Sequence, residues 1–197
     1  MLQKLPALLL GGALVAVACC AFVAAEPHRT SAPSHRTAVT VTPFSPSDVD
    51  PGKTRLRIDK SAYEMHLYEG DVLLKTYPVV LGPNPIDDKM QEGDGCTPEG
   101  RFRIQSKYPH NKWSHFLWID YPNASSWEKF RRRKREGILP ADATIGGEIG
   151  IHGVPVGQDE ILDKGINWTL GCISVRNAHI QEIYPLVQEG RVVDIER

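Results

Sequence analysis

A period-two alternation of apolar and polar residues, beginning near residue 55, constrains the fold of this chain more than any other feature. Leu56 and Ile58 alternate with charged residues, and Met65 and Leu67 alternate with Glu64 and His66. Successive strand side chains point to opposite faces of a sheet, so the pattern predicts half-buried β-strands. A turn at 69–71 and an apolar run at 72–81 extend this prediction to an antiparallel meander, with His66 on its solvent side.

Two helices interrupt the predicted strands. Residues 124–137 contain Ser125 and Ser126, either of which can cap a helix, and end in a basic run. Residues 177–188 place apolar residues on one face, with Asn177 as the expected cap. We therefore expect a predominantly β domain with at least two helices, an α+β fold.

Composition excludes several classes of protein. The chain has 197 residues, 41% of them hydrophobic, which is too apolar for a disordered protein. Four cysteines are too few for a disulfide scaffold, and a net charge of -1 argues against a nucleic-acid partner. One domain plus a tail fits this length.

The N-terminal residues 1–25 have the composition of a targeting segment. Lys4 is the only charged residue before Glu26, and an apolar stretch leads to small residues ending at Ala25. This pattern predicts a signal peptide cleaved after Ala25, or an uncleaved membrane anchor. Lipidation at Cys19 is a third alternative. Each alternative predicts a periplasmic or cell-envelope protein, with membrane contact only through this segment.

The composition changes again after the targeting segment. Residues 26–53 are rich in Pro, Ser, Thr and Asp, which predicts an extended linker. The folded domain is expected over 54–197. Within it, an acidic loop over 87–94 has no EF-hand spacing, so solvated charges are expected there. The basic run at 131–135 is expected to be a solvated helix end or a contact for an anionic polymer or membrane surface.

A cysteine directly after a glycine suggests a working thiol in an exported protein. A thiol needs a nearby base to become a thiolate, and His152 lies in a strand-like segment that can aim its imidazole into a cleft. Sixteen residues separate His152 from Thr169, enough for a loop to bring Cys172 beside it. The backbone around Gly171 can then hold an oxyanion. A buried structural cysteine and a Cys96–Cys172 disulfide remain as alternatives.

The segment that contains Cys172 resembles the signature of the L,D-transpeptidase catalytic domain, the YkuD family. That signature is a His, a spacer of this size, and then Ser or Thr, any residue, Gly and Cys. The resemblance covers about residues 54–197. It includes, in the family's order, the segments at 82–85, 93–102, 121–123 and 190–195.

The resemblance implies roles position by position. Cys172 matches the nucleophile and His152 the general base. Gly171 matches the position that holds the oxyanion and orients the histidine, and the Thr169 hydroxyl supports the site. Arg176 matches an arginine that either faces the peptide carboxylate or braces the loop.

Other positions of the motif are less settled. Gly153 and Trp168 are further substrate-binding candidates, although Trp168 equally fits the core. Leu170 stands where many members have His, and Ser174 where many have Arg or Asn. The form at 168–175 resembles the branch that includes the murein hydrolase YafK, which leaves the acyl acceptor open.

The resemblance implies a mixed β-sandwich around a Cys/His cleft and a peptidoglycan-modifying enzyme. Cys172 would form a thioester with a tetrapeptide stem, and an amine would resolve it into a 3→3 cross-link. Hydrolysis by water, as an amidopeptidase or L,D-carboxypeptidase, is the alternative. No metal or organic cofactor is expected, and carbapenem-type inhibitors are possible ligands. A noncatalytic wall-binding module is a weaker alternative, and a C-x-x-C redox motif is absent from the sequence.

Overall fold

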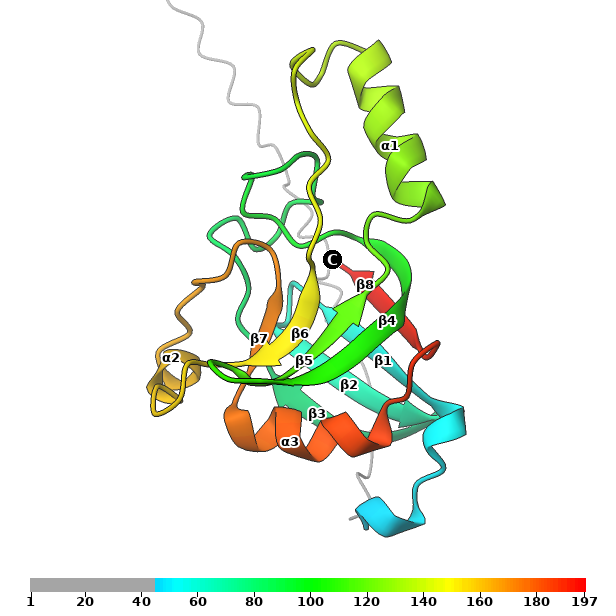
Figure 1. Cartoon of the computed structure of the whole chain (residues 1–197), viewed down its shortest axis with the longest axis vertical. Helices are drawn as coiled ribbons and strands as arrows, with labels where there is room; N and C mark the ends of the chain where they lie inside the picture. Colours follow the sequence, from blue (N-terminus) through cyan, green and yellow to red (C-terminus); the bar gives the residue numbers. More distant parts are fainter. Residues whose placement is uncertain (1–44) are drawn as a thin grey trace, which may run out of the picture. The chain divides into compact units, whose positions relative to one another are not determined.

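The computed structural model describes residues 45–197, and in this part of the chain eight strands form one mixed sheet (Figure 1). The strand order is β3-β2-β1-β8-β4-β5-β6-β7. The strands are β1 (Thr54–Asp59), β2 (Glu64–Glu69), β3 (Val72–Pro78), β4 (Gly100–His110), β5 (Ser114–Ile119), β6 (Gly150–Gly153), β7 (Ile173–Val175) and β8 (Val192–Glu196). The helices are α1 (Ala124–Arg135), α2 (Glu160–Asp163) and α3 (Asn177–Leu186), with short 3-10 helices η1 (Pro46–Asp48) and η2 (Pro51–Lys53). The predicted α+β class is confirmed.

The predicted meander is confirmed in β1, β2 and β3, which pair antiparallel in chain order. Leu56, Ile58, Met65 and Leu67 are fully buried, as the alternation predicts. His66 was expected to face solvent, and this is wrong. Its side chain is only 12% exposed, and its Nδ1 lies 2.9 Å from the hydroxyl of Thr76, the residue paired with it on the neighbouring strand β3.

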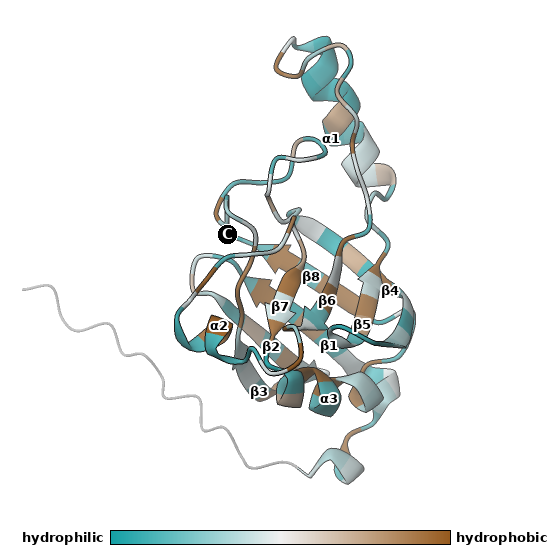
Figure 2. Cartoon of the chain, turned by 60° about the vertical axis from the view of Figure 1, so that its left-hand side comes forward, coloured by the Kyte–Doolittle hydropathy of each residue, from teal (hydrophilic) through white to brown (hydrophobic). Residues whose placement is uncertain are grey.

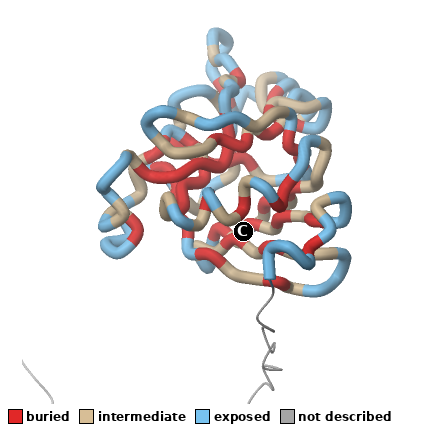
Figure 3. Tube along the Cα trace, turned by 60° about the horizontal axis from the view of Figure 1, so that its bottom comes forward, coloured by how far each residue is buried: buried red, intermediate tan, exposed pale blue. Residues whose placement is uncertain are grey.

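Strand β4 joins the two halves of the sheet. Its first residues, 100–103, pair with β8, whereas residues 104–110 pair with β5, and the register shifts between Ile104 and Ser106. The sheet therefore folds over on itself, and one apolar core contains side chains from both halves (Figure 1). Figure 3 shows that the buried segments run through the middle of the domain and the exposed segments lie mostly at its periphery. This arrangement is the expected mixed sandwich.

The second half of the sheet is closed by the chain that follows β3. Val80 and Ser174 exchange two backbone hydrogen bonds of 2.9 Å. Strands β6 and β7 run parallel to each other, as do β1 and β8. The parallel β6–β7 pair and the Val80 bridge fix the start of β7 from both sides.

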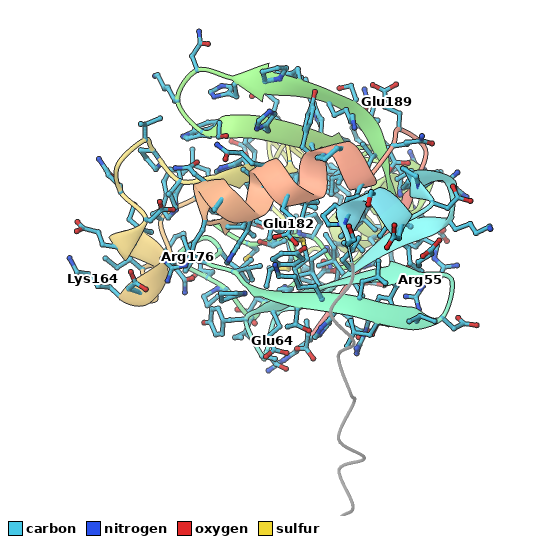
Figure 4. All side chains as sticks on the ribbon, turned by 90° about the horizontal axis from the view of Figure 1, so that it is seen from below. Arg55, Glu64, Lys164, Arg176, Glu182 and Glu189 are labelled. Atoms are coloured by element: carbon cyan, nitrogen blue, oxygen red, sulfur yellow. The ribbon has the colours of Figure 1, made fainter. Side chains whose placement is uncertain are left out.

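Helix α3 packs against β5 and β6 with Ile180, Ile183 and Leu186 buried. Figure 4, which shows the molecule from below, has this helix across its centre. Glu182 on the helix pairs with Lys75 of β3 at 2.7 Å. The helix starts one residue earlier than predicted, so its cap position is Arg176 and not Asn177.

Helix α1 is largely hydrophilic (Figure 2). Its cap is Asn123, whose Oδ1 accepts from the Ser126 amide at 3.1 Å, so the predicted Ser125 or Ser126 cap is wrong. Asn123 directly precedes the first helical residue, whereas both serines lie inside the helix. Phe130 on this helix is buried in the apolar core.

The acidic loop after β3 is anchored and not solvated, contrary to expectation. Asp88 pairs with Lys129 at 3.1 Å and with Arg133 at 2.8 Å, both from α1. The fully buried Lys60 Nζ donates to the carbonyls of Asp87 and Thr97 and to a carboxylate at 2.9 Å. Because this loop lacks strands or helices of its own, its charged side chains hold it in place. Part of the basic run on α1 is used for this purpose.

The predicted linker differs from expectation in its last residues. Residues 45–53 contain η1 and η2, and Val49 between them belongs to the apolar core. The targeting segment 1–25, with its lipidation candidate Cys19, and linker residues 26–44 lie outside the described residues. Among residues 45–197, each helix is too short or too polar to cross a membrane.

Candidate active site

Cys172 is placed by the turn that leads into β7. Thr169 Oγ1 donates to the Cys172 carbonyl at 2.8 Å and accepts from the Gly171 amide at 3.2 Å. Thr169 is buried, so its hydroxyl braces both sides of the turn. The half-buried Cys172 thiol donates weakly to the carbonyl of Glu148 at 3.5 Å.

Gly171 has no space for a side chain. Its φ is 129°, and a Cβ there would lie 2.6 Å from the carbonyl oxygen of Cys96. Only glycine lets the turn pack this closely against the loop beneath it. Its amide is already bonded to Thr169, so in this state the Gly171 N–H is not free to hold an oxyanion.

His152 lies on β6, opposite Ser174 of the adjoining β7, and is 2% exposed. Its Nδ1 lies 2.7 Å from the carbonyl oxygen of Gly153. A carbonyl only accepts, so Nδ1 carries the ring proton and Nε2 keeps a free lone pair. The residue that orients the imidazole is therefore Gly153 and not Gly171.

Gly153, a predicted substrate-binding residue, is not among the residues that line the cavity containing Cys172 and His152. It is buried, and a Cβ on it would lie 2.2 Å from Asn177 Oδ1 and 2.6 Å from the Trp113 carbonyl. The sequence motif shows that a glycine follows the histidine, but only the packing shows that this glycine serves the histidine.

Burial keeps both reacting groups neutral. It lowers the pKa of His152 to about 4, against a smaller opposite effect of its bond to Gly153. It raises the pKa of Cys172 to about 11, and the Gly150 N–H and the Lys89 charge act in the opposite direction. Near neutral pH the site therefore holds a thiol and a neutral imidazole, which is the form of histidine that accepts a proton.

A cavity of about 850 Å³ contains both side chains. This volume suits a small peptide or drug-sized ligand. The His152 ring lies between Trp113, at a centroid distance of 4.5 Å, and Phe116, at 5.5 Å, while Trp168 meets it edge-on at 5.6 Å. Trp168 lines the cavity and also packs against a small apolar cluster, so both expectations for it describe part of its environment.

Sequence reasoning missed most of the aromatic wall. It comprises Tyr108, His110, Trp113, Phe116 and Trp118, which come from β4, β5 and the hairpin between them. The signal available in the sequence was spacing by two residues, as in Phe116 and Trp118, which places both on one face of a strand.

Arg176 lies away from the cavity. It pairs with Asp163 of α2, and its guanidinium donates to the Asp159 carbonyl at 3.5 Å. Figure 4 shows it beside α2, near Lys164. Of the two roles implied by the resemblance, the structure places it as a brace for the loop. Leu170, by contrast, is 85% exposed and lines the cavity.

The disulfide alternative is not realised, because Cys96 and Cys172 are both free thiols. Cys96 is buried, and its backbone supports the turn at Gly171. In residues 45–197, no group of three or more His, Cys, Asp or Glu side chains is arranged to hold a metal ion.

Comparison with known families gives one extensive match. The sequence profile of the YkuD family, the L,D-transpeptidase catalytic domain, matches residues 53–195. No curated protein sequence matches the chain.

Several solved structures resemble the domain. Pgp2, the helical cell shape determining protein from Campylobacter jejuni, is similar with a TM-score of 0.53 and 23% identity, over 73% of this chain and 47% of that chain. Bd1075 from Bdellovibrio bacteriovorus has a TM-score of 0.50 and 21% identity, over 73% of this chain and 48% of that chain. The chain thus spans about half the length of these structures, and at such identities the likeness concerns the fold.

Proposed function

Because this chain belongs to the L,D-transpeptidase catalytic domain family, we propose that it is a cysteine acyltransferase that acts on peptidoglycan stem peptides. One observation carries the proposal. Cys172 and His152 lie on the wall of one cavity, on adjoining segments of the sheet, and the imidazole is held with Nε2 unprotonated.

The first half-reaction forms a thioester. The Cys172 proton passes to His152 Nε2 while Sγ attacks the carbonyl carbon of the third stem residue, a diamino acid. The peptide C–N bond then breaks, and the imidazolium returns the proton to the amine of the departing D-Ala. Since the Gly171 amide is engaged with Thr169, the Cys172 amide is the next donor along the turn for the oxyanion.

The second half-reaction transfers the acyl group. A side-chain amine of another stem would attack the thioester and give a 3→3 cross-link, with Cys172 leaving as the thiol. Hydrolysis is the second candidate, and Leu170 favours it. This side chain is 85% exposed at the cavity and cannot donate a hydrogen bond to an incoming acceptor.

Three further proposals extend this function. The N-terminal segment 1–25 would export the enzyme to the periplasm or cell envelope, where its substrate lies. Carbapenem-type inhibitors would acylate Cys172, since they present a strained carbonyl to the same thiol. Fold similarity to Pgp2, which is described as cell shape determining, supports a role in wall shape.

Incubation of the protein with disaccharide-tetrapeptides, followed by mass analysis, tests the function. Dimers lacking one D-Ala support transfer, and tripeptides support hydrolysis. Unchanged substrate would overturn the enzymatic proposal and favour a wall-binding module. The Cys172→Ser variant is the negative control, and the Cys96→Ser variant controls for the loss of a thiol elsewhere.

A further inference from the structure

Lys89 is the only Lys or Arg among the described residues that line the Cys172 cavity. Its side chain is 3% exposed, a degree of burial that lysines reach almost only when they are paired. Two acidic side chains, Glu92 and Glu148, line the same cavity, and most of the remaining wall is aromatic or glycine. Lys89 is therefore the one fixed cation that an anionic ligand can meet there.

The contacts of Lys89 leave part of its charge available. Its Nζ donates to Asp94 Oδ1 at 2.8 Å and to the Gln91 carbonyl at 3.1 Å, whereas an ammonium group has three protons. The third proton has no partner among residues 45–197.

The counter-ion of Lys89 is strongly committed elsewhere. Asp94 also accepts the backbone amides of Met90, Gln91 and Cys96, at 2.7, 3.0 and 3.0 Å. Its negative charge is thus shared among four donors, and Asp94 itself does not line the cavity. Lys89 lines the cavity and Asp94 does not, so a ligand in the cavity meets the lysine and not its counter-ion.

We propose that Lys89 binds a carboxylate of the stem peptide next to the scissile bond. This assignment rests on the proposed function and names a substrate-binding residue for it. Lys89 and Cys172 line the same cavity, so one stem peptide in it can reach both side chains.

The chemistry of the stem gives two sources for this carboxylate. One is the terminal D-Ala, whose carboxylate is two bonds from the scissile nitrogen. The other is the free carboxylate of the third residue, where that residue is a diamino diacid. Either group loses hydration on entering an aromatic cavity, and a buried carboxylate needs a cation in compensation. Arg176, the other candidate for this contact, is held against α2.

Binding measurements with an inert protein test the assignment without relying on turnover. In the Cys172→Ala protein, calorimetry would compare a tetrapeptide stem with the same stem amidated at D-Ala, or amidated at the third residue. We expect the free acid to bind about 10- to 100-fold more tightly than one of the two amides, which identifies the carboxylate. Adding Lys89→Gln should reduce this preference to less than about threefold while leaving the affinity for that amide nearly unchanged.

Lys129→Gln is the matched control. Lys129 holds the same loop through Asp88 at 3.1 Å and the Glu99 carbonyl at 2.8 Å, but it does not line the cavity. This variant should keep the preference for the acid.

The proposal is overturned if the parent protein shows no preference, if Lys89→Gln weakens acid and amide alike, or if Lys129→Gln abolishes the preference too. Release of D-Ala is measured separately, with the protein that retains Cys172. Acid-selective binding through Lys89 without release of D-Ala would refute the acyltransferase and leave the Lys89 site standing.

Discussion

At the scale of single residues, the site depends on one sulfur that is hard to ionise and one imidazole that is hard to protonate. We expect Cys172→Ser to lower turnover of tetrapeptide stems by at least about 100-fold, because an alcohol is a far weaker nucleophile than a thiolate. Mass analysis of products measures the loss, and circular dichroism checks the fold. Cys96→Ser should keep activity within about threefold, since Cys96 contributes its backbone to the site. Full turnover by the Cys172→Ser protein would refute the mechanism.

Burial of His152 also predicts a pH dependence of stability. Its folded pKa of about 4 lies below the ordinary 6.5, so between these values the unfolded chain binds a proton that the folded protein does not. This histidine therefore costs no stability above pH 6.5, and its cost grows as pH falls, reaching about 3 kcal/mol at pH 4.

Urea denaturation at pH 7 and pH 4 measures this cost. The fall in unfolding free energy between the two pH values should be about 3 kcal/mol smaller in His152→Gln than in the parent protein. Other groups that titrate in this range are present in both proteins and cancel. An equal fall in both proteins would show that His152 does not have a depressed pKa.

Residue types and spacing were enough to predict which side chains face the cavity within the motif itself. His152 lies on β6, and Thr169 and Cys172 lie in the short turn that leads into the adjoining β7, so the three side chains stay close together. Arg176 could not be placed this way. It follows the end of β7 and is the N-cap residue of α3, so neither the pairing of β7 nor the turn that holds Cys172 determines where its side chain points.

At the scale of elements, the turn before β7 tolerates no side chain at Gly171. We expect Gly171→Ala to lower activity by at least about tenfold and to destabilise the fold by about 2–3 kcal/mol, because a Cβ would lie 2.6 Å from the Cys96 carbonyl. Gly190→Ala is the control, since Gly190 has a φ of 82° but nothing within 4 Å of an added Cβ. It should show the backbone cost alone, about 1 kcal/mol, with activity retained. Equal effects of the two changes on activity would contradict the steric argument.

The start of α1 gives a second prediction for an element. Asn123→Ala should cost about 1 kcal/mol of unfolding free energy, because it removes the side chain that caps the helix. Ser125→Ala, at an exposed position inside the helix, should stay within about 0.5 kcal/mol of the parent. Denaturant titration compares the two variants, and a larger loss of unfolding free energy for Ser125→Ala would show that Ser125 caps the helix after all.

Asn and Ser are comparable N-cap residues, so residue type alone could not identify the cap of α1. The ion pairs of Lys129 and Arg133 with Asp88 fix the register instead.

At the scale of the whole molecule, the sequence predicted strands and helices better than their arrangement. Alternation identifies a strand such as β1 but not its neighbours, and here β1 lies between β2, which is next in the chain, and β8, which comes some 130 residues later. The anchored acidic loop was missed for the same reason, because the partners of Asp88 lie in another element.

The core also extends beyond the region matched by the family profile. Val49 is buried in it, four residues before the match begins at residue 53. We expect Val49→Ala to lower the unfolding free energy by about 1–2 kcal/mol, because it removes buried methyl groups. The catalytic rate should not change, because Val49 does not line the cavity. A cost below about 0.3 kcal/mol in urea titration would show that residues 45–53 do not contribute to the fold.

The central position of β8 has a consequence for synthesis of the chain. β1 and β4 both hydrogen-bond to β8, yet β8 begins 82 residues after β4 ends at His110. At 5–20 residues per second, a ribosome needs about 4–16 s to cover that interval. During this time the facing edges of β1 and β4 have no partner, and such edges invite pairing with other chains. Ribosome-bound chains ending before residue 192 should therefore stay protease-sensitive and bind chaperones, and resistance should appear only once β8 has emerged.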